Sequence, residues 1–287
     1  MTYYPTYWSS RGINLGTEFR YLESAAPLPP FQGQARVDYM MQDKERDGAA
    51  RWSTRYTHAG VANPYVAGGS VGLNLNINRV SDDNYWKDFA FSNPFGVQRL
   101  LSNDATMTWS NGIYSTGFKV QKWQTLQDLA NFKDNRIPPP FDRLPQINAR
   151  MQKLNTVGGL DVTLDGEVSR FESARDYDCN NASGTDYNNC APNANRFVTM
   201  AQVSRPFSTS YGYLTPKAQV VSRSYQFDGG LRNTGFYTQT NSQGLAGASV
   251  TVPTFSLDTG MAFERPAHWF DRNWIQTLEP RLLYVYT

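Results

Sequence analysis

Val71-Gly72-Leu73-Asn74-Leu75-Asn76-Ile77-Asn78 is a run of eight residues whose side chains alternate strictly in polarity. Val71, Leu73, Leu75 and Ile77 form one set, and Gly72 and the three asparagines form the other. Successive side chains of a β-strand point to opposite faces. The stretch therefore predicts a strand with one apolar face and one polar face.

The same alternation recurs along the chain, in segments 12–22, 160–165 and 255–264. The polar faces of these segments carry Asn, Asp, Glu and Arg, which suit contact with water. In segment 118–126 the pattern is less regular, because Lys122 falls on the apolar side and Trp123 on the polar side. The register of that strand is therefore left open.

About thirteen strands are predicted, with boundaries good to about three residues. They are 1–8, 12–23, 32–43, 50–60, 68–80, 96–110, 113–126, 144–155, 158–171, 195–207, 210–226, 248–264 and 274–287. Most reach the roughly ten residues of a tilted transmembrane strand. Short turns, as at Asn111-Gly112, alternate with four long connections at 81–95, 127–143, 172–194 and 227–247. Outer-membrane barrels have this asymmetry, and we expect the long connections to face the cell exterior.

The composition agrees with a barrel. Aromatic residues make up 14% of the 287 residues and charged residues only 18%, which favours aromatic girdles and a wet lumen over an aliphatic core. A net charge of +2 gives no signal for nucleic acid binding.

The segment 59–78 contains Pro64 and four glycines, so a membrane span here requires strands rather than a helix. Met1 leads directly into Thr2-Tyr3-Tyr4-Pro5 without a signal-peptide pattern, and we read the chain as a fragment.

Several motifs then carry a family resemblance. They are, in order, Tyr4-Pro5-Thr6-Tyr7-Trp8 with Arg11-Gly12; Glu18-Phe19-Arg20-Tyr21-Leu22; Val80-Ser81-Asp82-Asp83-Asn84-Tyr85-Trp86-Lys87-Asp88-Phe89; Leu144-Pro145-Gln146-Ile147; Phe263-Glu264-Arg265; and Gln276-Thr277-Leu278-Glu279-Pro280-Arg281 with Tyr284 and Tyr286. In this order and spacing they resemble the lipopolysaccharide-assembly family LptD over nearly the whole chain.

The resemblance implies an all-β, antiparallel, 26-stranded barrel in the outer membrane of a Gram-negative cell. Residues 1–287 would be its first half, without the N-terminal periplasmic jelly-roll domain and the closing strands. The implied partners are lipopolysaccharide, an LptE-like plug lipoprotein, a periplasmic Lpt bridge protein and outer-membrane lipids. The implied function is lipopolysaccharide transport to the outer leaflet, with no cofactor. A porin or substrate-specific channel and a soluble β-sandwich or propeller remain the alternatives.

The resemblance also places a lateral gate on the first strand, at Thr2, Tyr3, Tyr4, Pro5, Thr6 and Tyr7. Proline has no N–H group, so Pro5 removes one bond from a ladder that would otherwise be continuous. A weak ladder lowers the cost of parting two strands. The alternative is that Pro5 only blunts an edge strand or marks its start.

A set of charged residues on the polar faces is expected to line the lumen: Glu18, Arg20, Arg36, Asp38, Arg150, Asp161, Asp165, Glu264, Glu279 and Arg281. A hydrolase could use such carboxylates, but acids and arginines alternate here, which favours a hydrated ion-pair network. The two histidines, His58 and His268, lie near no nucleophile motif. We therefore expect no catalytic residue and no enzyme.

Asp82, Asp83 and Asp88 also allow a cation site, although their spacing fits no EF-hand. We expect instead no metal and a solvated external loop, anchored at the rim by Tyr85, Trp86 and Phe89. Aromatics near strand ends are expected at the membrane interface, namely Trp8, Tyr21, Trp52, Tyr56, Trp109 and Tyr284. The only cysteines, Cys179 and Cys190, fall in one external connection, and we expect them to form a disulfide.

Overall fold

The computed structural model describes residues 1–24, 30–90, 98–128, 137–174, 192–231 and 245–287. These residues form sixteen strands, one short 3-10 helix and one four-residue α-helix. The prediction of an all-β, antiparallel fold is confirmed. Within the described ranges, no helix is long and apolar enough to cross a membrane.

The elements follow one another as β1 (Thr2–Trp8), β2 (Gly12–Glu23), β3 (Phe31–Asp43), η1 (Lys44–Arg46), β4 (Ala49–Val66), β5 (Gly69–Val80), α1 (Tyr85–Asp88), β6 (Leu100–Ser110), β7 (Tyr114–Thr125), β8 (Asp142–Lys153), β9 (Asp161–Glu172), β10 (Ala194–Ser204), β11 (Phe207–Thr209), β12 (Gly212–Leu231), β13 (Leu245–Met261), β14 (Phe263–Trp269), β15 (Arg272–Leu278) and β16 (Arg281–Tyr286). Strands β1 to β10, β12, β13 and β16 pair in that order in one sheet, and β11 adds to β12. A separate two-stranded sheet joins β14 to β15.

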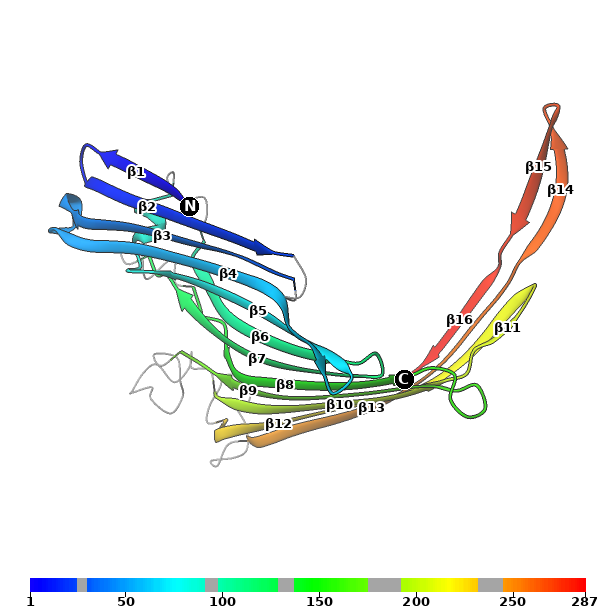
Figure 1. Ribbon diagram of the computed structural model, residues 1–287. Coiled ribbons are helices and arrows are strands. Elements are labelled where there is room, and N and C mark those ends of the chain that lie inside the picture. The colour runs from blue at the N-terminus through cyan, green and yellow to red at the C-terminus, as the bar shows by residue number, and fades with distance from the viewer. Residues whose placement is uncertain (25–29, 91–97, 129–136, 175–191, 232–244) are drawn as a thin grey trace.

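The large sheet is curved like a trough, and the β14–β15 hairpin projects from one end of it (Figure 1). Because consecutive strands are antiparallel, the connections alternate between the two ends. The connections β5–β6, β7–β8, β9–β10 and β12–β13 therefore share one end, which we call the long-loop end. The turns β4–β5, β6–β7 and β8–β9 lie at the other, the short-turn end.

The two faces of the sheet have opposite polarity. We call the face against which residues 81–90 pack the inner face, and the opposite one the outer face. On β2, the outer-face residues Ile13 and Leu15 are 60% and 56% exposed, whereas Asn14 and Glu18 on the inner face are each 5% exposed. This is the reverse of a soluble protein, in which apolar side chains are the buried ones.

Strand β5 follows the predicted alternation. Asn76 lies opposite Thr57 of β4 and Asp104 of β6 on the inner face, while Leu75 lies between His58 and Ala105 on the outer face. The Asn76 side chain donates to the Asp104 carboxylate at 3.2 Å. Opposed residues share a face, so this register carries the polarity of β5 to its neighbours.

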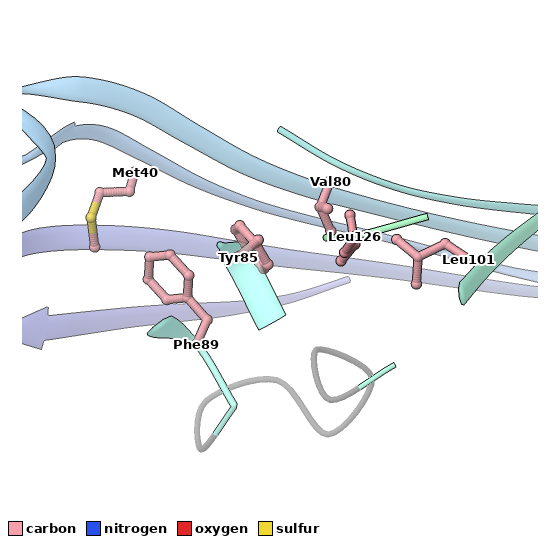
Figure 2. Packing of buried hydrophobic residues seen from close by; sticks show 6 residues of the cluster. All are labelled: Met40, Val80, Tyr85, Phe89, Leu101 and Leu126. Atoms are coloured by element: carbon pink, nitrogen blue, oxygen red, sulfur yellow. The ribbon is translucent and has the colours of Figure 1, made fainter. Parts of the chain in front are cut away.

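Six buried apolar side chains form one cluster, in which Tyr85 and Phe89 lie in a row between Met40 and the pair Val80 and Leu126, with Leu101 at the far end (Figure 2). Trp8 and Trp86 pack against the cluster. It lies where residues 81–90 fold onto the inner face.

Several predicted strand boundaries were wrong. The strand predicted to end at 226 is β12, which continues to Leu231. Strand β4 continues to Val66, and the turn to β5 is only Ala67-Gly68, where both residues have positive φ (50° and 71°). Single strands over 248–264 and 274–287 were also wrong, because the pairing breaks at Ala262 and at Glu279-Pro280. The hairpin turn lies at Phe270-Asp271, beyond residue 264, where the predicted strand ended. Pro266 pairs with Ile275, and among the described residues β14 has a partner on one edge only, so a proline is tolerated there.

Candidate functional site: a charged inner face with an inward-folded segment

The first group of predicted lumenal residues lies on the inner face of β2 and β3. Glu18 is buried and forms an ion pair with Arg20. Arg36 donates to Asp38 at 3.0 Å. Glu18 and Arg36 are opposite one another in the register. These four charges are therefore paired locally, as an ion-pair network requires.

The second group lies farther along the sheet. Arg150 on β8 faces Asp165 on β9, with 3.6 Å between charged atoms. Asp161 has a different role, because it accepts the Asn155 N–H at 2.8 Å and closes the β8–β9 turn. Arg281 on β16 contacts Asp258 of β13 at 2.6 Å.

Glu264 and Glu279 lie outside the large sheet. Glu264 is on the projecting hairpin, opposite Thr277, and Glu279 lies in the break before β16. The sequence suggested a lumenal position for Glu264 because the alternation of 255–263 continues through residue 264. The break at Ala262 interrupts that continuity.

A denser charge cluster at the long-loop end was not predicted. Its members are Arg11, Asp43, Glu45, Arg46, Arg51, Asp82 and Asp88, which we call the arginine cluster. Arg51 is 3% exposed and contacts Asp43 at 3.0 Å, Asp82 at 2.8 Å and Asp88 at 2.6 Å. Asp43 is completely buried and also accepts from Arg11 at 2.7 Å. Burying charges is tolerated only when they are paired in this way.

Residues 81–90 complete this cluster from the inside of the trough. The Asn84 N–H donates to the Asp82 side chain at 3.1 Å, a local turn that leads into α1. Tyr85 and Phe89 are 3% and 1% exposed. The Arg51 guanidinium lies 4.8 Å from the centre of the Phe89 ring. The prediction of a solvated loop anchored only at the rim was therefore wrong for these residues, because their aromatic rings cover the buried arginines.

The three aspartates whose sequence allowed a cation site are in contact with arginine side chains or a backbone N–H. Asp82 and Asp88 contact Arg51, and Asp83 accepts the backbone N–H of Gln127. Burial raises the pKa of Asp83, with the neighbouring charge of Asp82 acting in the same direction. Burial also opposes ionisation of Asp88, but hydrogen bonds from Arg51 and Arg46 outweigh it and lower the Asp88 pKa. Burial raises the pKa of Tyr85 to about 12, so this phenol stays protonated.

Strand β1 forms one edge of the large sheet. Its partner is β2, and no strand pairs with its other edge in the described ranges. In the β1–β2 turn the Arg11 N–H donates to the Trp8 carbonyl at 3.2 Å, so the backbone polar groups of Trp8 face β2. Backbone groups two residues apart point the same way. Those of Thr6 therefore face β2, whereas Pro5 faces the unpaired edge.

Aromatic side chains gather on the outer face near the short-turn end. The Tyr21 hydroxyl lies 2.8 Å from the Tyr56 hydroxyl and 2.7 Å from Nδ1 of His58. Trp109 also lies on the outer face near this end, opposite Val71. Trp52 lies on the outer face near the long-loop end, opposite Tyr39. Rings with one apolar side and one polar end suit a membrane interface.

Trp8 departs from that pattern. It lies on the inner face and meets Phe89 edge-on, with ring centres 6.0 Å apart. Cys179 and Cys190 lie outside the described residues.

A curved antiparallel sheet with an apolar outer face and a charged inner face is the wall of a transmembrane β-barrel, left open here between β1 and β16. A family model described as "LptD: LPS transport system D" matches residues 49–287, and the chain belongs to this family.

Relatives named LPS-assembly protein LptD match along the whole chain. The protein of Albidiferax ferrireducens is 43% identical over 100% of this chain and 32% of its own length. That of Acidovorax sp. (strain JS42) is 43% identical over 99% of this chain and 32% of its own length. That of Ralstonia nicotianae is 33% identical over 100% and 31%. The chain thus spans about a third of the length of the curated relatives it matches.

Proposed function

We propose that this chain forms part of the wall of an outer-membrane translocon, which takes lipopolysaccharide from the periplasmic side and releases it into the outer leaflet without covalent chemistry. The observation that carries the proposal is the opposite polarity of the two faces of one sheet. Lipopolysaccharide has the same division, because its acyl chains need hydrocarbon and its phosphorylated sugars need water or paired charges. The name of the relatives, LPS-assembly protein LptD, supports lipopolysaccharide as the substrate.

The same division of polarity supports a membrane location. We place the sheet in the outer membrane of a Gram-negative cell, with the long-loop end at the cell surface. The wall would be the first half of a 26-stranded barrel. Among the described residues, one edge of β1 and one edge of β16 have no partner strand. This supports further strands, because a sheet edge in hydrocarbon leaves its backbone groups unsatisfied.

The partners in the proposal are lipopolysaccharide, outer-membrane lipids, an LptE-like lipoprotein that fills the lumen, and a periplasmic Lpt bridge protein that docks on an N-terminal jelly-roll domain. The charged pairs Arg36–Asp38 and Arg150–Asp165 support a lumen that accepts a polar plug or a sugar head group. The first pair lies along β3 and the second joins β8 to β9, so charged pairs occur on well-separated parts of the inner face.

The lateral gate would lie along β1, at Thr2, Tyr3, Tyr4, Pro5, Thr6 and Tyr7. The direction of Pro5 supports this position, since Pro5 withholds a donor from the edge where a closing strand would pair. A net hydrogen bond contributes about 0.5–1.5 kcal/mol in water, so one missing bond weakens the seam without unfolding the barrel.

The test uses the full-length parent protein, reconstituted in liposomes with its plug partner and loaded with lipopolysaccharide. The proposal expects lipopolysaccharide to reach the liposome membrane, and expects a cysteine at Thr6 cross-linked to the closing strand to stop delivery until the bond is reduced. A porin would instead give a steady single-channel conductance with no delivery. Delivery at the normal rate by the cross-linked protein would reject the gate assignment.

A further inference from the structure

Three chain segments that are distant in sequence meet at the long-loop end. They are the β1–β2 turn, the β3–β4 connection and α1. Asp88 of α1 joins all three, because its carboxylate lies 3.1 Å from Arg11, 2.9 Å from Arg46 and 2.6 Å from Arg51. One carboxylate therefore connects the first hairpin to the second.

The backbone makes the same connection. The Lys44 N–H donates to the Arg11 carbonyl at 3.0 Å, which joins the second hairpin to the first at the level of the cluster. Arg11 is 9% exposed, and its side chain contacts both Asp43 and Glu45. The turn of the first hairpin is therefore held by charged contacts that are mostly screened from water.

Phe89 adds an apolar contact. Its ring is 1% exposed and meets the edge of Trp8, the last residue of β1, while the Arg11 guanidinium lies 5.6 Å from its ring centre. Edge-to-face aromatic pairs at such distances are favourable beyond the area they bury. Phe89 and Asp88 thus hold both the end of β1 and the turn that follows it.

We infer that residues 81–90 are a latch, which fixes the long-loop end of the β1–β2 hairpin to the β3–β4 hairpin. The inference deepens the proposed function, on which it rests for the role of β1 as a gate strand. With its long-loop end held to the β3–β4 hairpin, β1 moves least at Trp8 and most around Pro5 and toward the short-turn end when it parts from the closing strand. A movement of the whole first hairpin away from the second requires the contacts of Asp88 and Phe89 with Arg11 and Trp8 to break.

The Asp88→Asn variant tests the latch. An asparagine keeps the shape but offers one acceptor oxygen and turns an NH₂ group toward the guanidinium groups, which only donate. The matched control is Asp82→Asn, which loses a contact with the same Arg51 but none with Arg11. Phe89→Leu is the second variant, because it keeps an apolar side chain and removes the aromatic contact with Trp8.

The measurement is hydrogen–deuterium exchange in the full-length protein in liposomes, read at the amides of Arg11 and Lys44. We expect Asp88→Asn to speed exchange at both amides at least about tenfold, because hydrogen bonds to a charged group are lost. Phe89→Leu should also speed exchange at both amides. Asp82→Asn should change the exchange rates less than about threefold. Unchanged exchange in Asp88→Asn and Phe89→Leu, or equal acceleration in Asp82→Asn, would overturn the latch.

Lipopolysaccharide delivery is measured in parallel, and it separates the two claims. If the parent protein delivers no lipopolysaccharide while Asp88→Asn speeds exchange at Arg11, the latch is kept and the proposed function is rejected. Normal delivery with unchanged exchange in all three variants rejects the latch alone. If Asp88→Asn does not fold, Phe89→Leu decides the outcome.

Discussion

The ring of Tyr21 lies directly over Gly33 on the outer face, so that a Cβ atom at Gly33 would be only 2.1 Å from the Tyr21 hydroxyl oxygen. The same Cβ would be 2.6 Å from the Thr57 carbonyl oxygen. The missing side chain at Gly33 is thus what allows Tyr21 to reach Tyr56 and His58 across β3.

Gly33→Ala should therefore displace Tyr21 and break its two hydrogen bonds. We expect the free energy of unfolding to fall by about 1–3 kcal/mol, the usual cost of overpacking. The loss is measured as a lower urea midpoint for unfolding of the protein in liposomes. Gly166→Ala is the control, because its nearest neighbour would be 4.0 Å away. The free energy of unfolding of Gly166→Ala should stay within about 0.5 kcal/mol of that of the parent. Equal effects of the two substitutions would contradict this packing.

Arg51→Ala should be among the most damaging single substitutions in the arginine cluster. It leaves Asp43, Asp82 and Asp88 with fewer partners in a buried place, which costs about 3–5 kcal/mol when one partner of a buried pair is removed. Arg51→Lys keeps the charge but loses the planar fork that contacts three carboxylates, so it should fall between the parent and alanine. Urea unfolding measures both. A lysine variant as stable as the parent would show that charge alone suffices.

The pKa shifts of Asp83 and Asp88 predict pH effects of opposite sign. The Asp83 pKa is raised in the folded protein, so its ionisation lowers stability once the pH rises above the ordinary aspartate range. Asp83→Asn should raise the urea midpoint at pH 7, and the gain should shrink as the pH falls back toward that range.

The Asp88 pKa is lowered, so Asp88 stabilises the fold above its ordinary pKa, and that contribution is lost on acidification. Asp88→Asn should therefore lower the midpoint at pH 7, with a difference that shrinks toward acid. The same sign for both variants at pH 7 would contradict the burial described for residues 81–90.

The position of Pro5 predicts a transport effect without a folding effect. Pro5→Ala restores an N–H donor on the edge of β1 that faces away from β2, which would strengthen the proposed seam by about 0.5–1.5 kcal/mol. Delivery of lipopolysaccharide by the full-length protein should slow about two- to tenfold if parting this seam limits the rate. Heat-modifiable migration on gels checks that the barrel still assembles. Unchanged delivery with normal assembly would mean that Pro5 only blunts a strand edge.

The strands and their faces could be predicted because alternation is a local property. Leu73, Leu75 and Asn76 show their faces from the sequence itself, and pairing to β4 and β6 preserves them. The pairing Arg150–Asp165 could be anticipated for the same reason, since both residues lie on the polar sides of neighbouring strands.

The inward fold of residues 81–90 could not be predicted in this way. It depends on Asp88 meeting Arg11 and on Phe89 meeting Trp8, contacts between distant segments that leave no periodic signal. The polar run Ser81-Asp82-Asp83-Asn84 reads as a solvated loop unless its arginine partners are known. Likewise, the break at Ala262 and the separate β14–β15 hairpin leave no signal in the alternation of residues 255–264.

The proposed translocon wall has its outer face in hydrocarbon and its inner face in water, and the alternating residues of β5 allow both environments to be measured on one strand. A nitroxide label is placed in turn at residues 73, 74, 75, 76, 77 and 78 of the full-length protein in liposomes, and its collisions with oxygen and with a water-soluble nickel chelate are measured. We expect strict alternation, with oxygen contact highest at Leu73, Leu75 and Ile77 and nickel contact highest at the three asparagines. Equal accessibility to the nickel chelate at all six positions would contradict it.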